Sequence, residues 1–213
     1  MSNGLEWDRV QDYLQSWPSP RAPELGAMEQ RASEDDFPII GPVCGQLCYQ
    51  LARAIGARRV FELGSGFGYS TAWFARAVLD NGGGEVHHVV WDAALSAEAR
   101  VHLERLGLGQ VVRYHVGEAV SALRAAEGRF DLVFVDIDKE GYPEAFALAQ
   151  DKVRPGGLLI ADNLLWDGRI FDPADQSEST VGIRRASELL RSSELWLSTI
   201  LPIRDGLLVA TRR

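Results

Sequence analysis

From residue 42 to residue 191, short apolar runs of strand length alternate with longer segments that show helical periodicity. The apolar runs are RRVFELG, EVHHVVWD, VVRYHVG, FDLVFVD and GGLLIADN. A chain that alternates strands with helices buries the strands in a parallel sheet and covers both faces of that sheet with the helices. This alternation limits the chain to the α/β class.

The C-terminal stretch LWLSTILPIRDGLLVATRR contains two further strand-like runs, joined at Asp205-Gly206, a dipeptide typical of a hairpin turn. Such a hairpin adds one antiparallel strand to the sheet. We therefore predict a Rossmann-like, doubly wound sheet of seven strands, mostly parallel, with one antiparallel strand from the C-terminal hairpin. Ligands of such sheets bind beyond the carboxyl ends of the strands.

Length and composition predict one domain that spans residues 1–213. Residues 1–36 form an N-terminal helical prelude, which Pro18, Pro20 and Pro23 divide into two helices. Hydrophobic residues make up 46% and charged residues 24% of the chain, as in folded globular proteins. No apolar run reaches the length of a membrane span, and the polar N-terminus resembles neither a signal nor a transit peptide. These features favour the cytoplasm and predict no contact with a membrane.

The net charge of −8 argues against a nucleic-acid partner, because such proteins usually present a basic surface. Cys44 and Cys48 lie four apart on a predicted helix, and we interpret them as small core residues rather than a disulfide. The four histidines lack the spacing of metal ligands and are interpreted as structural. Two helix boundaries are also predicted: Ser96 as an N-cap and Pro155 as a stop.

The glycine-rich stretch FELGSGFGYS follows the first strand and opens a helix. Gly64, Gly66 and Gly68 have no side chains, so a ligand can approach their backbone closely. Asp92 ends the second strand, where a carboxylate can accept hydrogen bonds from a ribose diol. Ala119, beyond the third strand, leaves room for a flat base. Three successive strand ends thus predict a nucleoside-binding rim.

Glu62 indicates which nucleotide binds at this rim. A carboxylate repels a pyrophosphate but attracts a cationic amino-acid moiety. S-adenosylmethionine combines adenosine, a sulfonium cation and an amino acid, and so fits better than a nicotinamide dinucleotide, for which the third glycine also comes one position early. The alternative is that Glu62 caps a helix and Asp92 is a solvated turn residue.

Two strands then end in carboxylates. The fourth ends in Asp136-Ile137-Asp138-Lys139, and the fifth in ADNLLW, which begins at residue 161. If these strands are neighbours, Asp136, Asp162 and Asn163 converge at one edge of the sheet. Three oxygen ligands suit a hard divalent cation, Mg²⁺ first, with Ca²⁺ or Mn²⁺ as alternatives. The two acids could instead only accept helix N-terminal amides.

Lys139 follows these acids and is predicted to be a general base. A lysine beside a bound cation gives up its proton more readily, and a hydroxyl held by a metal ion is more acidic. The resulting oxygen would attack the sulfonium methyl group. The alternative is a salt bridge from Lys139 to Asp138 or Glu140 without a catalytic part.

Four stretches resemble the cation-dependent O-methyltransferases of the caffeoyl-CoA and catechol type. They are FELGSGFGYS, VFVDIDKEGY, GGLLIADNLLWDG and LPIRDGLLVATRR. The resemblance covers residues 36–213, and its specific part is the motif pair D-x-D-K and D-N-x-L-W. It implies that Asp136, Asp162 and Asn163 are metal ligands and that Lys139 is the base.

The same resemblance implies cofactor contacts at several matching positions, with Asp138 beside the cofactor. With the glycines, the predicted cofactor-binding set is Glu62, Gly64, Gly66, Gly68, Ser70, Asp92, Ala119, Asp136 and Asp138. Trp166 would edge the substrate pocket. Ile40 and Gly41 stand where many family members carry small hydroxyl residues, and Ile39 and Ile40 suggest an apolar substrate edge. Phe67 also departs from the family, which commonly has threonine there. The loop DGRIFDPADQSEST differs widely among members and is expected to set specificity.

The sequence thus predicts an enzyme that uses S-adenosylmethionine and a divalent metal to methylate a hydroxyl of a small catechol-like or hydroxycinnamoyl aromatic. The resemblance also implies a homodimer whose N-terminal helices help to build the interface and an active-site lid. The alternatives are methylation of a hydroxylated tRNA base and S-adenosylmethionine binding without catalysis. A nicotinamide-dependent oxidoreductase is disfavoured by the glycine spacing.

Overall fold

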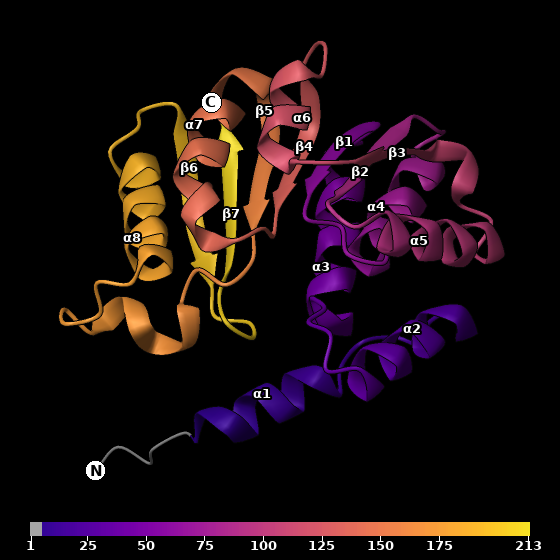
Figure 1. Ribbon diagram of the computed structural model, residues 1–213, viewed down its shortest axis with the longest axis horizontal. Helices are drawn as coiled ribbons and strands as arrows, with labels where there is room; N and C mark the ends of the chain where they lie inside the picture. Colours follow the sequence, from indigo (N-terminus) through magenta and orange to yellow (C-terminus); the bar gives the residue numbers. More distant parts are fainter. Residues whose placement is uncertain (1–5) are drawn as a thin grey trace.

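A seven-stranded sheet forms the middle layer of the computed structural model, which describes residues 6–213 (Figure 1). The strands are β1 (Arg59–Leu63), β2 (Glu85–Val90), β3 (Val112–Val116), β4 (Phe130–Val135), β5 (Val153–Ala161), β6 (Trp196–Leu201) and β7 (Leu207–Arg212). Their order is β3-β2-β1-β4-β5-β7-β6, and only β7 runs antiparallel to its neighbours. The predicted fold class is therefore confirmed. The order reverses between β1 and β4, which is where open α/β sheets bind ligands.

Helices cover both faces of this sheet. They are α1 (Trp7–Gln15), α2 (Pro23–Glu34), α3 (Gly41–Ala54), α4 (Tyr69–Asp80), α5 (Ala93–Arg105), α6 (Ala119–Ala125), α7 (Tyr142–Lys152) and α8 (Glu178–Arg191), with short 3₁₀ turns at Gly109–Val111, Lys139–Gly141 and Trp166–Phe171. One apolar cluster holds residues of α2 to α5, and a second holds residues of α6 to α8. Among residues 6–213, no helix has the length and apolar character needed to cross a membrane.

Strand β4 explains why the sequence shows continuous apolar runs. Leu132 and Phe134 belong to the cluster on one face of the sheet, and Val133 and Val135 to the cluster on the other. All four side chains are fully buried. A parallel strand that is covered on both faces needs apolar residues at every position rather than at alternate positions.

The N-terminal region contributes the two helices α1 and α2. Pro23 begins α2, where its fixed φ suits the first helical turn. Helix α1 lies below the body of the molecule in Figure 1. Gln11 joins α1 to the turn between β6 and β7, because its side-chain amide donates to Pro202 O (3.2 Å) and accepts from the backbone N–H of Arg204 (2.9 Å).

Two predicted helix boundaries are wrong. The N-cap of α5 is Asp92, whose Oδ1 accepts from the backbone N–H of Ala94 (2.7 Å), whereas Ser96 is buried one turn further on. Helix α7 ends at Lys152 before it reaches Pro155. Val153 is already extended and Pro155 lies within β5, near the place where the β4–β5 register shifts. Proline is tolerated at such irregular points of a strand.

Gly45 lies where α3 crosses α4, and a Cβ atom there would come within 2.2 Å of Trp73 Nε1. We expect Gly45→Ala to lower the free energy of unfolding by about 1–3 kcal/mol, because the overpacked helices must move apart. Gly26 on α2 is the matched control, since a Cβ atom added there would meet no heavy atom within 4 Å. Gly26→Ala should raise stability by about 0.5–1 kcal/mol. Denaturant unfolding measures both, and a Gly45→Ala variant as stable as the wild type would contradict this packing.

Candidate active site

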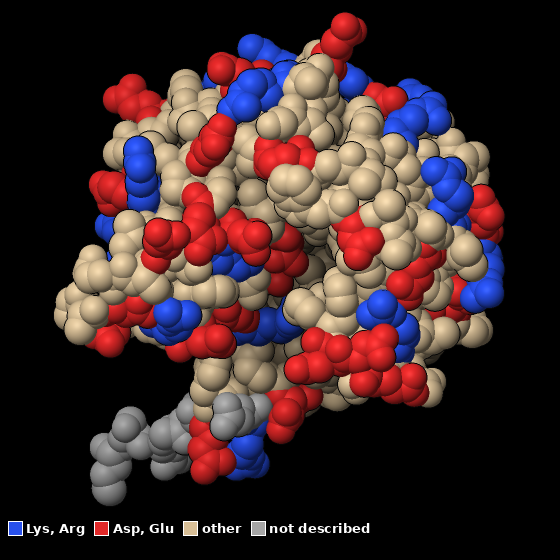
Figure 2. Space-filling model, viewed as in Figure 1, with Lys and Arg blue, Asp and Glu red and all other residues tan. Residues whose placement is uncertain are grey.

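A cavity of about 970 Å³ opens beyond the carboxyl ends of β1, β2, β4 and β5. In Figure 2 a hollow lies near the middle of the face shown, with acidic side chains on both sides of it. Most residues predicted from the sequence line this cavity. They are Ile39, Ile40, Gly64, Gly66, Ser70, Asp92, Ala119, Asp136, Asp138, Lys139, Asp162, Asn163 and Trp166. Glu62 and Gly68 do not belong to the lining. Glu62 is buried in β1, and Gly68 directly precedes α4.

The glycine-rich turn joins β1 to α4 and touches the end of β4. Gly64 has a φ of +84°, and a Cβ atom there would lie 1.9 Å from the carbonyl oxygen of Asp136. Gly68 has a φ of +91°, and its Cβ would lie 2.9 Å from that of Ala99 on α5. Gly64 therefore permits the close approach of the turn to the acidic strand end, whereas Gly68 permits the packing of α4 on α5.

Glu62 is buried beneath this turn. The Thr71 hydroxyl donates to Glu62 Oε2 and lies 2.9 Å from His88 Nδ1, while Glu62 Oε1 is buried without a protein partner among the described residues. Burial raises the pKa of Glu62 to about 7 and lowers the pKa of His88 to about 3. The carboxyl group thus forms part of a buried polar layer that supports the turn.

The end of β2 contributes Trp91 and Asp92 to the cavity. Asp92 caps α5 through Oδ1 only, so its other carboxylate oxygen is free of that role. Trp91 is 68% exposed and lines the cavity, so its ring is accessible to a ligand. Glu118 caps α6 through the backbone N–H groups of Val120 (2.7 Å) and Ser121 (2.6 Å). We did not predict Trp91 or Glu118 from the sequence, although Trp91 directly precedes Asp92.

Lys139 joins the ends of β4 and β5. Its side chain is almost fully buried, and Nζ donates to Asp136 Oδ1 (3.1 Å), Asn163 Oδ1 (2.9 Å) and Ile137 O (3.1 Å). The Tyr142 hydroxyl lies 3.0 Å from Nζ. The alternative pairing of Lys139 with Asp138 or Glu140 is not observed, since the Lys139 ion pair is with Asp136.

Asp162 is only 2% exposed. Arg204 Nη1 lies 3.3 Å from its Oδ2, whereas Oδ1 is buried and has no partner among the described side chains. Burial first, and the nearby charge of Asp136 second, raise the pKa of Asp162 to about 6. Arg204 was not predicted from the sequence. The only local signal was a charged residue beside the Asp205-Gly206 turn.

Backbone strain is concentrated at this inner end of the cavity. Asn163, Trp166, Asp167 and Arg204 have φ values of 60°, 50°, 49° and 50°, a region that non-glycine residues rarely adopt. The segment after β5 is bonded to the β6–β7 turn through Leu164 N–H to Gly206 O (2.9 Å) and Asp167 N–H to Asp205 Oδ1 (2.7 Å). Such strain is typical of functional sites.

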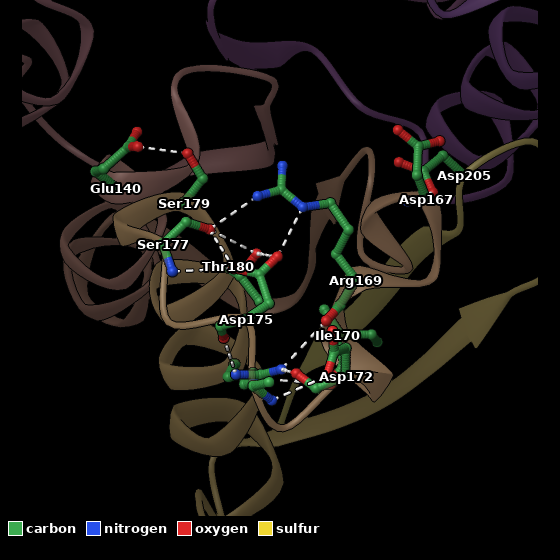
Figure 3. Close-up of polar contacts among 12 residues, drawn as sticks. Glu140, Asp167, Arg169, Ile170, Asp172, Asp175, Ser177, Ser179, Thr180 and Asp205 are labelled. Atoms are coloured by element: carbon green, nitrogen blue, oxygen red, sulfur yellow. Dashed lines mark hydrogen bonds and ion pairs between the residues drawn. The ribbon is translucent and has the colours of Figure 1, made fainter.

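The loop after Trp166 is held by its own polar contacts (Figure 3). Arg169 Nε lies 2.7 Å from Asp175 Oδ2, and Ser177 Oγ donates to Asp175 Oδ1 (2.7 Å). Arg184 of α8 donates to the carbonyl oxygens of several loop residues. The Arg169 guanidinium also lies 5.5 Å from the centre of the Trp166 ring. This loop is therefore a preformed wall behind the cavity.

The inner end of the cavity suits a hard cation. Within residues 6–213 no group of three His, Cys, Asp or Glu side chains could hold a metal ion. The oxygen atoms at this end of the cavity come from two carboxylates and an amide. Asp136 and Asn163 already direct oxygens at one ammonium group, and Asp162 has an unpartnered buried oxygen. Oxygen ligands of this type fit Mg²⁺ or Ca²⁺.

Comparisons with known proteins identify the family to which this fold and sequence are similar. The model of a family described as O-methyltransferase matches residues 34–213. The catechol O-methyltransferase of Niastella koreensis is 31% identical to this chain, over 93% of the chain and 92% of that protein. The structure of the O-methyltransferase TomG from Streptomyces achromogenes, in complex with S-adenosylmethionine, is 30% identical with a TM-score of 0.86, covering 100% of this chain and 99% of TomG. An O-methyltransferase from Bacillus cereus, in complex with S-adenosylhomocysteine, is 28% identical with a TM-score of 0.87, covering 97% and 98% of the two chains.

The buried Glu62 makes stability depend on pH. Its pKa rises from 4.5 to about 7 in the folded protein, so the stability gained from the bound proton is present at acid pH and is lost as the pH rises through about 7. Glu62→Gln has no proton to lose. As the pH rises from about 5 to about 8, the free energy of unfolding of the variant should increase by roughly 2–3 kcal/mol relative to that of the wild type. Denaturant unfolding at a series of pH values measures this difference.

Glu85 provides a control of opposite sign. Partial burial raises the pKa of Glu85, but the hydrogen bond from Arg59 and the nearby His87 ring outweigh this effect and lower the pKa overall. The stability from ionised Glu85 is therefore present above its unfolded pKa and is lost as the pH falls. Glu85→Gln should lose stability relative to the wild type as the pH rises. If Glu62→Gln showed the same trend as Glu85→Gln, the assignment of Glu62 would be wrong.

Proposed function

Because this chain belongs to the O-methyltransferase family and is an S-adenosylmethionine-dependent O-methyltransferase, we propose that its methyl acceptor is a small catechol-like or hydroxycinnamoyl aromatic and that a divalent cation holds the acceptor hydroxyl. The observation that carries the proposal is the convergence of Asp136 and Asn163 on Lys139, with Asp162 beside them. This cluster lies next to the glycine-rich turn, so a methyl donor and a hydroxyl acceptor can meet there.

In this proposal the turn and the ends of β2 and β3 hold S-adenosylmethionine, which supplies an electrophilic methyl group. The backbone at Gly64 and Gly66, with Ser70, would bind the amino-acid end. Asp92 would accept from the ribose, and the exposed Trp91 would stack on the base beside Ala119. Asp138 also lines the cavity. Glu62 and Gly68 would shape the turn from behind instead of touching the cofactor.

Asp136, Asp162 and Asn163 would hold the cation, preferably Mg²⁺. When bound, such an ion makes an attached hydroxyl more acidic and stabilises the negative charge on its oxygen. Lys139 Nζ lies within hydrogen-bond reach of two of the proposed ligand oxygens. In its neutral amine form, which a cation bound beside it would favour, Nζ would accept the hydroxyl proton. The buried Tyr142 hydroxyl orients Nζ, because it lies 3.0 Å from Nζ and donates to Asp162 O (2.9 Å).

Apolar side chains support an aromatic acceptor. Ile39, Ile40 and Trp166 line the cavity near the proposed cation ligands. Such apolar side chains exclude water, and the planar Trp166 ring can stack on an aromatic acceptor. The acidic margin of the hollow in Figure 2 disfavours a polyanionic acceptor such as tRNA, and so supports a small molecule.

We also propose that the protein forms a homodimer through its N-terminal residues. Trp7, Tyr13 and Trp17 are 47%, 60% and 69% exposed. The rings of Tyr13 and Trp17 lie 5.7 Å apart and form one aromatic surface. Exposed aromatic groups of this kind are common at protein interfaces.

The cation can be tested by its removal. Transfer of the methyl group to a catechol should cease in EDTA and return with added Mg²⁺, measured as S-adenosylhomocysteine formation. Asp162→Asn removes one ligand charge, so the Mg²⁺ concentration for half-maximal activity should rise by roughly tenfold or more. Binding of S-adenosylhomocysteine should change little. Asp151→Asn, at an exposed site on α7, is the matched control. Full activity in EDTA would contradict the proposal.

Lys139 can be tested against the other lysine of the chain. Lys139→Ala should lower kcat by about 10²–10⁴-fold, because the acceptor hydroxyl loses its proton acceptor, while calorimetry should find S-adenosylhomocysteine bound nearly as tightly as before. Lys152 lies at the end of α7, where it donates to Arg124 O (3.1 Å), and Lys152→Ala should keep the wild-type kcat. Wild-type turnover of Lys139→Ala at neutral and alkaline pH would exclude Lys139 as the base.

A further inference from the structure

Arg204 projects from the turn between β6 and β7 into the proposed acceptor end of the cavity. It lines the cavity together with Trp166, Ile40 and Asp162. Its φ of +50° costs of order 1 kcal/mol for a residue with a Cβ atom. The Gln11 side chain donates to Pro202 O and accepts from the backbone N–H of Arg204. The surrounding structure thus keeps this arginine in an unfavourable backbone conformation at the cavity wall.

The Arg204 guanidinium is little used by the protein. Its Nη1 bond to Asp162 Oδ2, at 3.3 Å, is its one hydrogen bond to an oxygen within residues 6–213. A guanidinium carries five N–H donors in a planar fork. Arg184 shows the contrast, because its fork is satisfied by four backbone carbonyl groups. Arg204 is 27% exposed in its side chain and still has donors to offer to a ligand.

A second unpartnered donor lies close to Arg204 in the fold. Trp166 Nε1 is buried and has no protein acceptor among the described residues. Trp166 belongs to the segment whose backbone is bonded to Asp205 and Gly206, directly after Arg204. Buried N–H groups are nearly always hydrogen-bonded, so Trp166 Nε1 can donate to a ligand, and the partly exposed Arg204 guanidinium offers further donors.

The guanidinium of Arg204 can accommodate an anion at this end of the cavity. Asp136 and Asp162 face Lys139 and Arg204, and Asp205 adds a third carboxylate near Lys139. A divalent cation on Asp162 would compete for the carboxylate that Arg204 pairs with and would leave the guanidinium without an anion. A carboxylate on the acceptor would balance the remaining charge and match the guanidinium fork in shape.

Resting on the proposed function, we propose that Arg204 is a specificity-determining residue that binds a carboxylate substituent of the aromatic acceptor. The preferred acceptors are therefore dihydroxylated aromatic acids, and neutral catechols are poorer. The ring lies against Trp166 and the Ile39-Ile40 edge, its hydroxyls face Lys139, and its carboxylate faces Arg204.

The test compares 3,4-dihydroxybenzoate with its methyl ester, which has the same ring and hydroxyls but no charge. The readout is the ratio of kcat/KM for the acid to kcat/KM for the ester, at saturating S-adenosylmethionine and Mg²⁺. In Arg204→Gln this ratio should fall by about 10- to 100-fold. The ratio for Arg204→Lys should lie between those of the wild type and Arg204→Gln, because lysine keeps the charge but lacks the planar fork of donors. The ratio cancels any change in folding or cation affinity, since both acceptors experience it equally.

Arg169→Gln is the matched control. It removes the same charge from the loop behind Trp166, at a residue outside the cavity lining, and should leave the ratio unchanged. An unchanged ratio in Arg204→Gln, or an equal fall in Arg169→Gln, would overturn the inference.

If the wild type methylates neither acceptor, the proposed function is wrong. The role of Arg204 is then tested by measuring how tightly the acid and the ester bind. With S-adenosylhomocysteine and Mg²⁺ present, calorimetry should show the acid binding more tightly to the wild type than to Arg204→Gln, with no such difference for the ester. Equal affinities of both proteins for the acid would overturn it.

Discussion

The parallel pairing of β4 with β5 is the constraint on which the site depends. Val135 is in register with Ala161, and the backbone N–H of Asp162 donates to Val135 O (3.2 Å). Asp136 and Asp162 therefore leave the sheet side by side, although they are far apart in sequence. Two adjacent carboxylates repel one another unless a cation lies between or beside them. Lys139 and Arg204 supply that positive charge from the chain itself, and in our proposal the same oxygens would hold a divalent ion.

The site is held at an energetic cost that the sheet and its helices offset. Glu62 and Asp162 are buried carboxyl groups whose pKa values are raised to about 7 and about 6, chiefly by burial. Buried groups of this kind destabilise a fold in their charged form, and they are common where a protein binds or reacts with ligands. The left-handed backbone at Asn163, Trp166 and Arg204 adds further strain. The mostly apolar strands β1, β4 and β5, covered on both faces, provide the stability that tolerates these residues.

The fold could be predicted because its pattern is local: continuous apolar runs of strand length can only belong to a sheet covered on both faces, and β4 is such a strand. The cavity lining could largely be predicted because parallel strands end at one edge, so Asp92, Asp136 and Asp162 meet there. Which residues face the cavity one by one could not. Glu62 points into a buried polar layer with Thr71 and His88, and Gly68 lies against Ala99 of α5. Arg204 and Trp166 come together only through the contact of the β6–β7 turn with the segment after β5. The errors at Ser96 and Pro155 arose where a nearer residue, Asp92 or Val153, already set the boundary.

A crystal structure with S-adenosylhomocysteine and Mn²⁺, with the ion located by its anomalous scattering, tests the central claim most directly. The account predicts one strong anomalous peak bound by oxygens of Asp136, Asp162 and Asn163, next to Lys139 and facing the sulfur of the cofactor. A peak elsewhere, or these three side chains turned away from a common point while the cofactor is bound, would contradict it.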